Sequence, residues 1–420
     1  MSDSGRTSQV GSGRNPEGAS VPDAGRVLDD VRVLDLTRVV AGPFATAILA
    51  DLGAEVIKVE RPGTGDDYRY GPSEKGHTSL SFQNVNRGKR SITLDLRKDA
   101  GRELLLRLSE GADALVENFR SGFMDAQGLG AAALQARNPR LVVASLSGFG
   151  HTGPRAGEAS YDIVAQAAGG LLAMTGFPDG PPVRGGGALA DFIGGLYLAL
   201  GIVAALLERD RTGRARVIDL SNQDAVFAIT DSAATIFAGI GAPMGRVGNQ
   251  HPFSAPYDCY ATNDGWVALG TASNKLFRKL CAAIERPELG SDERFRSHRG
   301  RAANREDINR IVADWMCRRS CAEALSALGS EGADLPCARV QSPEELIEDP
   351  QLLARGMLER HAHPSIGEVL FHGNPLQLSG AAPRQRALAP DLGQDNADVY
   401  AEELGLDEEE LARLSADGVI

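Results

Sequence analysis

The 420-residue sequence lacks an excess of positive charge and lacks an uninterrupted apolar run long enough to cross a membrane. Its formal net charge of -12 argues against nucleic acid as the main partner, because binding a phosphate backbone needs a positive surface. A membrane span needs about 20 apolar residues, whereas glycines interrupt the apolar run over residues 192–207, which predicts a buried helix. We therefore expect the chain to bind neither nucleic acid nor a membrane.

Cysteine is also scarce, and its spacing suggests neither a disulfide framework nor a metal site. The five cysteines are Cys259, Cys281, Cys317, Cys321 and Cys337. No second pair or nearby histidine completes a zinc site around Cys317 and Cys321. We expect reduced thiols in a cytoplasmic protein without a bound metal. Residues 1–25 lack the hydrophobic core of a signal peptide and predict a disordered tail.

The usual phosphate-binding glycine motifs are absent too. No G-x-G-x-x-G loop follows the first predicted strand, and no G-x-x-x-x-G-K-[ST] sequence occurs. Both motifs bring backbone N–H groups against a nucleotide phosphate. Their absence argues against a nicotinamide-dependent oxidoreductase.

From Val31 onward, short β-rich runs alternate regularly with helical stretches. Strands are predicted at residues 31–36, 55–60, 91–96, 114–116 and 141–146, and helices at 44–52, 98–109 and 122–136. Strands separated by helices of this length imply a parallel Rossmann-like sheet, with ligands at the carboxyl ends of the strands. The predicted fold class is α/β.

The rhythm changes near residue 225, where glycine, proline and aromatic residues gather before a new helical region. We predict a large Rossmann-like, ligand-binding domain over residues 26–225 and a smaller α+β domain over 226–345. The C-terminal segment, 346–420, is predicted to return to the large domain.

Positive side chains gather at the ends of three predicted strands. Arg61 follows the strand at residues 55–60. Residues 86–91 concentrate three charges beside a glycine, residues 94–98 add two, and residues 117–120 end in Arg120. Because a parallel sheet gathers the ends of its strands, these clusters match a ligand that carries several phosphates. Each cluster taken alone is also typical of a solvated face.

Asp191 stands between a glycine-rich turn, residues 181–187, and an apolar helical stretch. One interpretation is that Asp191 is simply the N-cap of that helix. The other is functional, because small residues leave space for a substrate and expose backbone N–H groups that stabilise an oxyanion. The start of a helix also favours an ionised carboxylate.

An ordered set of short motifs resembles the family III coenzyme A transferases. The matching stretches are residues 33–37 (VLDLT), 41–43 (AGP), 52–60 (LGAEVIKVE), 89–91 (KRS), 116–120 (VENFR), 138–140 (NPR), 148–150 (GFG), 161–162 (YD), 190–191 (AD), 212–214 (TGR) and 217–220 (VIDL). The resemblance covers roughly residues 28–420, and the ordered set is far more specific than any one member.

The resemblance implies that Asp191 is the catalytic nucleophile, which forms a mixed anhydride and then an aspartyl-CoA thioester. It implies coenzyme A, supplied as acyl-CoA, as co-substrate. The coenzyme A contacts would fall on Val40, Ala41, Arg61, Leu94, Asp95, Leu96, Arg97, Asn118, Phe119 and Arg120. It also implies an interlocked homodimer.

Substrate contacts would fall on Tyr161 and on the loop formed by Gly248, Asn249, Gln250 and His251. That loop replaces the glycine-only loop of the oxalate enzyme, so we do not expect oxalate and favour a larger dicarboxylate or hydroxy acid. An ordinary Asn- and Gly-rich turn is an equal interpretation of the same residues. Ala126 and Ala159 stand where relatives carry basic residues, which puts one phosphate contact in doubt.

Two alternatives belong to the same fold. The α-methylacyl-CoA racemases pair the equivalent aspartate with a histidine, whose position is Tyr161 here; tyrosine is a poor base at neutral pH, which favours the transferase. A non-catalytic CoA-binding protein is the other alternative, and the presence of Asp191 in its glycine setting argues against it.

Overall fold

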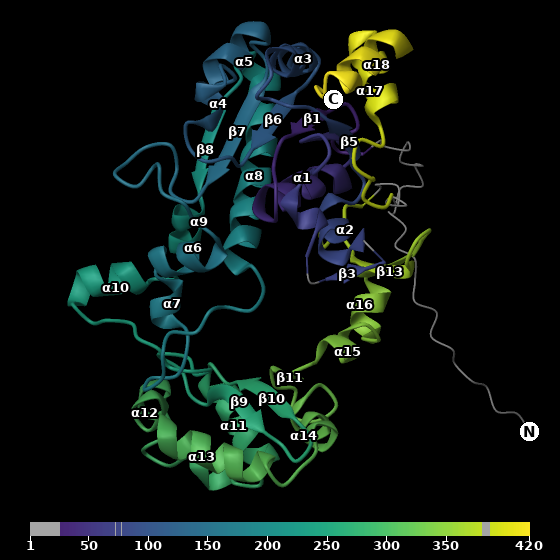
Figure 1. Ribbon diagram of the computed structural model, residues 1–420. Coiled ribbons are helices and arrows are strands. Elements are labelled where there is room, and N and C mark those ends of the chain that lie inside the picture. The colour runs from purple at the N-terminus through teal and green to yellow at the C-terminus, as the bar shows by residue number, and fades with distance from the viewer. Residues whose placement is uncertain (1–25, 72, 77, 380–386) are drawn as a thin grey trace, which may run out of the picture.

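The computed structural model describes residues 26–71, 73–76, 78–379 and 387–420. The predicted tail, residues 1–25, lies outside the described residues. Two sheets, each with its own hydrophobic core, dominate the described part and lie at opposite ends of the molecule (Figure 1).

The larger sheet has six strands, and every neighbouring pair is parallel. Its strands are β1 (Arg32–Asp35), β2 (Glu55–Glu60), β5 (Arg90–Thr93), β6 (Ala114–Glu117), β7 (Val142–Ser147) and β8 (Val217–Ser221). They lie in the order β5-β2-β1-β6-β7-β8. Counted along the chain, this is the 3-2-1-4-5-6 order of the dinucleotide-binding Rossmann fold. The predicted parallel sheet is confirmed.

Helices cover both faces of this sheet, because successive residues of a strand point to opposite sides. Val33 packs in the core under α1 (Ala41–Asp51) and α8 (Leu189–Thr212), whereas Leu34 packs in the core on the other face. That second face is covered by α3 (Asp99–Glu110), α4 (Phe123–Ala126) and α5 (Ala131–Arg137). The single helix predicted over residues 122–136 is wrong: Gly128 adopts a φ of 69°, which ends α4 before α5 begins.

Helix α8 has 24 residues and, by length and composition alone, is apolar enough to cross a membrane. We had expected no segment of that kind, since the glycines interrupt the apolar run. One face of α8 packs into the core through Leu198, Ile202 and Leu206. A core helix of a folded protein has the same length and composition, so α8 is weak evidence for a membrane span.

The smaller sheet is antiparallel, in the order β11-β10-β9. Its strands are β9 (Tyr257–Ala261), β10 (Trp266–Gly270) and β11 (Cys337–Arg339). It packs with the helices α11 (Asn274–Ala283), η2 (Pro287–Gly290), α12 (His298–Ala303), α13 (Arg305–Met316) and α14 (Cys321–Leu328). Two pairs of helices flank the segment from α8 to β8. In the chain, α6 (Asp162–Ala168) and α7 (Leu171–Met174) precede α8, and α9 (Asn222–Ala228) and α10 (Ala233–Ile240) lie between β8 and β9.

The C-terminal segment runs back from the smaller sheet to the larger one (Figure 1). Its elements are α15 (Pro343–Leu346), α16 (Pro350–Ala354), β12 (Leu358–His363), β13 (Gly367–His372), α17 (Asn396–Leu404) and α18 (Glu408–Ala416). Four short elements lie in the chain between β2 and β5: η1 (Asp67–Arg69), β3 (Glu74–Lys75), β4 (Thr78–Ser79) and α2 (Leu80–Asn86). Tyr400 donates to the Thr93 carbonyl at 2.8 Å, and the Thr93 N–H donates to Asn396 Oδ1. These contacts hold α17 against β5 of the larger sheet. The domain limits near residues 225 and 345 stay a prediction.

Candidate active site

Two adjoining cavities open where the strands of the larger sheet end. They share Arg38, Phe119 and Arg120 as lining residues. The first, of about 280 Å³, lies over the ends of β1, β2, β5 and β6, and the second, of about 340 Å³, contains Asp191. This is the edge at which ligands bind in open parallel sheets. The two cavities together form a continuous candidate site.

Asp191 lies in the first turn of α8 and lines the second cavity. The N-cap of α8 is Ala188, and no side chain caps it. The interpretation of Asp191 as a simple N-cap is therefore wrong. Asn222, at the start of α9 directly after β8, donates from Nδ2 to Asp191 Oδ1 at 3.1 Å. The carboxylate is thus aimed at the cavity with one oxygen held.

The surroundings of Asp191 make its carboxylate poorly hydrated and basic for an aspartate. Burial raises the pKa of Asp191 to about 6, and repulsion from Asp162 acts in the same direction. The hydrogen bond from Asn222 opposes both by lowering the pKa. Asp162 is itself fixed, because Oδ1 accepts from the Ala190 N–H at 2.8 Å. At neutral pH the carboxylate is mostly ionised, as a nucleophile requires.

The loop between β1 and α1 forms another wall of the second cavity through Val39, Val40 and Ala41. Val39 has a φ of 68°, which is unusual for a β-branched residue. Its N–H donates to Asp66 Oδ1 at 3.0 Å, and Asp66 in turn pairs with the buried Lys58. Backbone strain of this kind persists only when the surroundings hold it in place. The buried pair thus fixes the loop that carries Val40 and Ala41.

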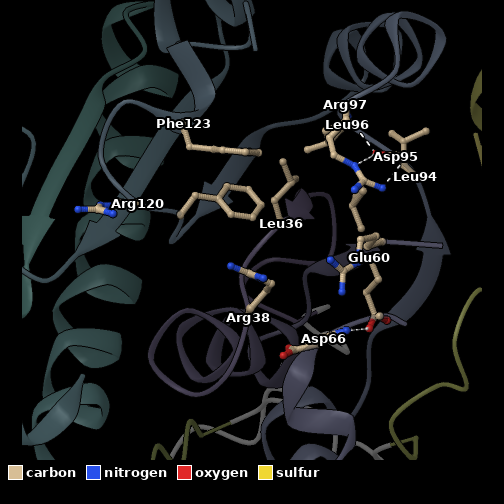
Figure 2. A pocket seen from close by; sticks show the side chains of 14 residues that line it. Leu36, Arg38, Glu60, Asp66, Leu94, Asp95, Leu96, Arg97, Arg120 and Phe123 are labelled. Atoms are coloured by element: carbon tan, nitrogen blue, oxygen red, sulfur yellow. Dashed lines mark hydrogen bonds and ion pairs between the residues drawn. The ribbon is translucent and has the colours of Figure 1, made fainter. Parts of the chain in front are cut away.

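The first cavity combines cations with apolar and aromatic surfaces (Figure 2). The sequence-predicted residues that line it are Arg61, Leu94, Asp95, Leu96, Arg97, Phe119 and Arg120. Arg97 donates two hydrogen bonds to the Asp95 carboxylate, from Nε and from Nη2, each at 2.9 Å. Arg120 donates to the Gly157 carbonyl, and Arg38 lies 5.4 Å from the centre of the Phe119 ring. The cavity supplies positive charge that can bind phosphate groups and flat aromatic faces against which a nucleobase can stack.

The structure brings most, but not all, of the predicted site residues together. Val40, Ala41, Asn118 and Tyr161 line the second cavity with Asp191. Gly248, Asn249, Gln250 and His251 are not among the residues that line either cavity. Asn249 instead lines a separate cavity beside β9 and β10. Within a single chain, this loop therefore does not line the cavity that contains Asp191.

Sequence reasoning missed Arg38 and Asn222. Arg38 follows the predicted strand at residues 31–36, which is the signal that singled out Arg61 and Arg120. No strand is predicted before Asn222, where residues 217–220 stand only as a family motif. Asn222 comes immediately after β8, and Arg38 lies three residues beyond β1. His151, by contrast, contacts Ser121 and Ser145 through its ring nitrogens and belongs to the loop after β7. Within the residues that the structure describes, no group of three His, Cys, Asp or Glu side chains is arranged to hold a metal.

Comparisons with known proteins identify the family. The family model described as CoA-transferase family III matches residues 28–396. The acetyl-CoA:oxalate CoA-transferase of Acetobacter aceti is 40% identical over 89% of this chain and 95% of its own length. The succinyl-CoA–D-citramalate CoA-transferase of Chloroflexus aurantiacus is 37% identical over 94% and 98%. A CAIB/BAIF family protein from Brucella suis, known from its crystal structure, has a TM-score of 0.80 and 36% identity, covering 90% of this chain and 99% of its own.

Proposed function

Because the chain belongs to CoA-transferase family III and is a CoA-transferase, we propose that Asp191 is the nucleophile that carries coenzyme A from a donor acyl-CoA to a dicarboxylic or hydroxy acid. The observation that supports this role is the position of one partly buried, ionised carboxylate in the cavity that adjoins the arginine-lined cavity. Activity of this kind needs a carboxylate that water does not shield.

In the proposed reaction, the free oxygen of Asp191 attacks the thioester carbon of the donor. The C–S bond breaks, coenzyme A leaves as a thiolate with the electron pair, and a mixed anhydride forms. The thiolate then attacks Cγ of Asp191, and the donor acid leaves as a carboxylate, which gives an aspartyl-CoA thioester. The acceptor carboxylate runs the same two steps in reverse. No proton and no redox partner is needed.

We assign the phosphate end of coenzyme A to the first cavity, where Arg61 and Arg120 line the walls. Val40, Ala41 and Asn118 line the second cavity, so the pantetheine arm would pass them on its way to Asp191. The shared residues Phe119 and Arg120 lie where the two cavities adjoin. In this arrangement, the thioester reaches Asp191 while the charged end stays at the strand ends.

The acceptor is proposed to be a dicarboxylate or a hydroxy acid. The similar enzymes named above act on oxalate and on citramalate. The loop formed by residues 248–251 is polar and larger than a glycine-only loop, which favours the larger acid. Oxalate is the necessary comparison, because the oxalate enzyme is 40% identical to this chain.

We further propose that the enzyme is a homodimer in which the 248–251 loop of one copy reaches the Asp191 cavity of the other. Exposed apolar side chains support this proposal: Leu196, Tyr197, Leu200 and Leu207 on α8, and Phe237 and Ile240 on α10. Helix α10 projects from the rest of the chain (Figure 1). Apolar surface of this extent is typical of protein interfaces. The free state of all five cysteines supports a cytoplasmic location, which we also propose.

The test is an exchange assay with the purified protein. Acetyl-CoA and succinyl-CoA are the donors, and oxalate, citramalate, malate, glutarate and propionate are the acceptors; new CoA esters are separated by chromatography. We expect citramalate, malate and glutarate to react faster than oxalate and propionate. Asp191→Ala should lose at least about 10⁴-fold in rate, while Asp179→Ala, an exposed acid, stays active. Transfer by Asp191→Ala at the normal rate would refute the assignment. Deuterium uptake at an α-carbon, without transfer, would indicate the racemase instead.

A further inference from the structure

Asn222 is the side chain that contacts the reacting group and has no role assigned above. Its Nδ2 donates to Asp191 Oδ1 at 3.1 Å, and the residue is 8% exposed. It lines the same cavity as Asp191. The contact joins the N-terminal turn of α8 to that of α9, so two helix starts hold the amide and the carboxylate against each other.

The other end of the Asn222 amide is unusual. Its Oδ1 is buried and has no hydrogen-bond partner among the described residues. Leaving a buried acceptor without a partner is unfavourable for folding. The opposite amide orientation would place Oδ1 against an ionised carboxylate oxygen, which is repulsive. An amide whose N–H donates while its buried oxygen accepts no hydrogen bond points to a function rather than to a contribution to stability.

Gly194 gives this amide its space. A Cβ at Gly194 would lie 2.0 Å from Asn222 Oδ1, which is far inside van der Waals contact. Gly194 lies one turn beyond Asp191 on α8. The absence of a side chain at this position therefore lets Asn222 approach the first turn of the helix.

We propose that the Asn222 amide is a catalytic hydrogen-bond donor, which holds one oxygen of Asp191 while the other attacks and then stabilises the negative charge on the held oxygen. This proposal rests on the proposed nucleophilic role of Asp191. When the thiolate attacks Cγ of the anhydride, the electron pair of the carbonyl moves onto the oxygen that faces Asn222. The charge returns as the Cγ–O bond to the acyl group breaks. A donor already in place stabilises that oxyanion without reorganisation.

The same geometry serves the second half of the reaction. The acceptor carboxylate attacks Cγ of the aspartyl-CoA thioester, and the held oxygen again takes up the charge. Every attack on Cγ therefore places negative charge on the oxygen to which Asn222 donates. The attacks on the donor and acceptor acyl carbons do not, because their oxyanions lie on the substrate. Of the four steps, two therefore need Asn222 and two do not.

The decisive variant is Asn222→Leu, which has nearly the same shape but no donor. We expect a loss of about 10²–10³-fold in kcat, together with an unchanged or raised Tm, since the unpartnered oxygen is gone. Gln223→Ala is the matched control on the same turn of α9: it loses a hydrogen bond to the Ala168 carbonyl but does not contact Asp191. A packing role for Asn222 would give the opposite result, with a lowered Tm and nearly normal kcat.

Two further measurements separate the proposal from its premise. Mixing the enzyme with acyl-CoA and no acceptor should build up an aspartyl-CoA adduct, visible by intact mass, about 10²-fold more slowly in Asn222→Leu than in Gln223→Ala. The acid limb of the kcat profile should also move to higher pH, because the bond from Asn222 lowers the pKa of Asp191. Equal adduct rates in the two variants overturn the role of Asn222 alone. Failure of the wild type to form an adduct at position 191 overturns the proposed function as well.

Discussion

Lys58 Nζ lies 3.0 Å from Asp66 Oδ2, and both side chains are completely buried. Lys58 also donates to the Thr37 carbonyl at 2.8 Å, and Asp66 accepts from the Val39 N–H. The attraction of Lys58 lowers the pKa of the Asp66 carboxyl despite its burial. This ion pair connects β2 to the loop between β1 and α1, and so supports one wall of the cavity of Asp191.

Removing one partner of this ion pair should strongly lower the free energy of unfolding. Lys58→Met leaves the Asp66 carboxylate buried without its cation, and we expect a loss of about 3–5 kcal/mol in the free energy of unfolding. Arg140→Met, which removes the exposed pair with Asp210, should change it by less than about 1 kcal/mol. Denaturant unfolding of both variants, of Asp66→Leu and of the double variant Lys58→Met/Asp66→Leu gives the comparison. A double variant as unstable as the sum of its parts would contradict the coupling.

Gly195 allows α8 to approach α1. A Cβ at Gly195 would lie 2.6 Å from the Ala41 carbonyl oxygen, and Ala41 lines the cavity. We expect Gly195→Ala to lower the free energy of unfolding by about 1–3 kcal/mol through overpacking and to lower kcat. Gly201→Ala on the same helix meets Ile218 only at 3.6 Å, an ordinary contact, and should raise stability by up to about 1 kcal/mol. Thermal and denaturant unfolding distinguish the two, and equal effects would refute the close-approach argument.

The pH dependence of the reaction should follow Asp191. Burial, aided by Asp162, raises its pKa to about 6. The nucleophile must be ionised, so kcat should fall tenfold per pH unit below about 6 and be constant above it. Asp162→Asn removes the repulsion and should move this limb to lower pH, whereas Asp179→Asn, an exposed change, should leave it in place. A limb that does not move in Asp162→Asn would show that another group controls the profile.

Arg120 should contribute to binding rather than to chemistry. It lines both cavities and holds the Gly157 carbonyl with Nε and Nη2. We expect Arg120→Ala to raise KM for acyl-CoA about 10-fold, with a smaller change in kcat, because a charge-assisted bond to phosphate is lost. The difference should shrink at high salt. Arg216→Ala, which removes an exposed pair with Glu208, is the control; a KM equal to that of the control would argue against a coenzyme A contact.

The sequence by itself determined the alternation of strands and helices from β1 to β7 and marked the position of Asp191. Strands separated by helices implied a parallel sheet. The consecutive buried side chains Val33 and Leu34 agree with helices on both of its faces. Strand-end positions predicted Arg61 and Arg120 for the same reason, because a parallel sheet gathers its strand ends at one edge. The glycine-rich setting and the family motifs marked Asp191.

The tertiary structure decided the environment of that aspartate. The contact between Asp191 and Asn222 joins residues 31 apart in sequence, and no local pattern encodes it. The pKa of Asp191 depends on burial by several segments and on the distance to Asp162, which only the folded chain fixes. The 248–251 loop was also beyond local reasoning, since its distance from the Asp191 cavity depends on how the two sheets are placed. The periodicity of apolar residues specifies helices and strands. The ionisation and hydration of Asp191, and the distance of the 248–251 loop from it, depend on how those helices and strands pack.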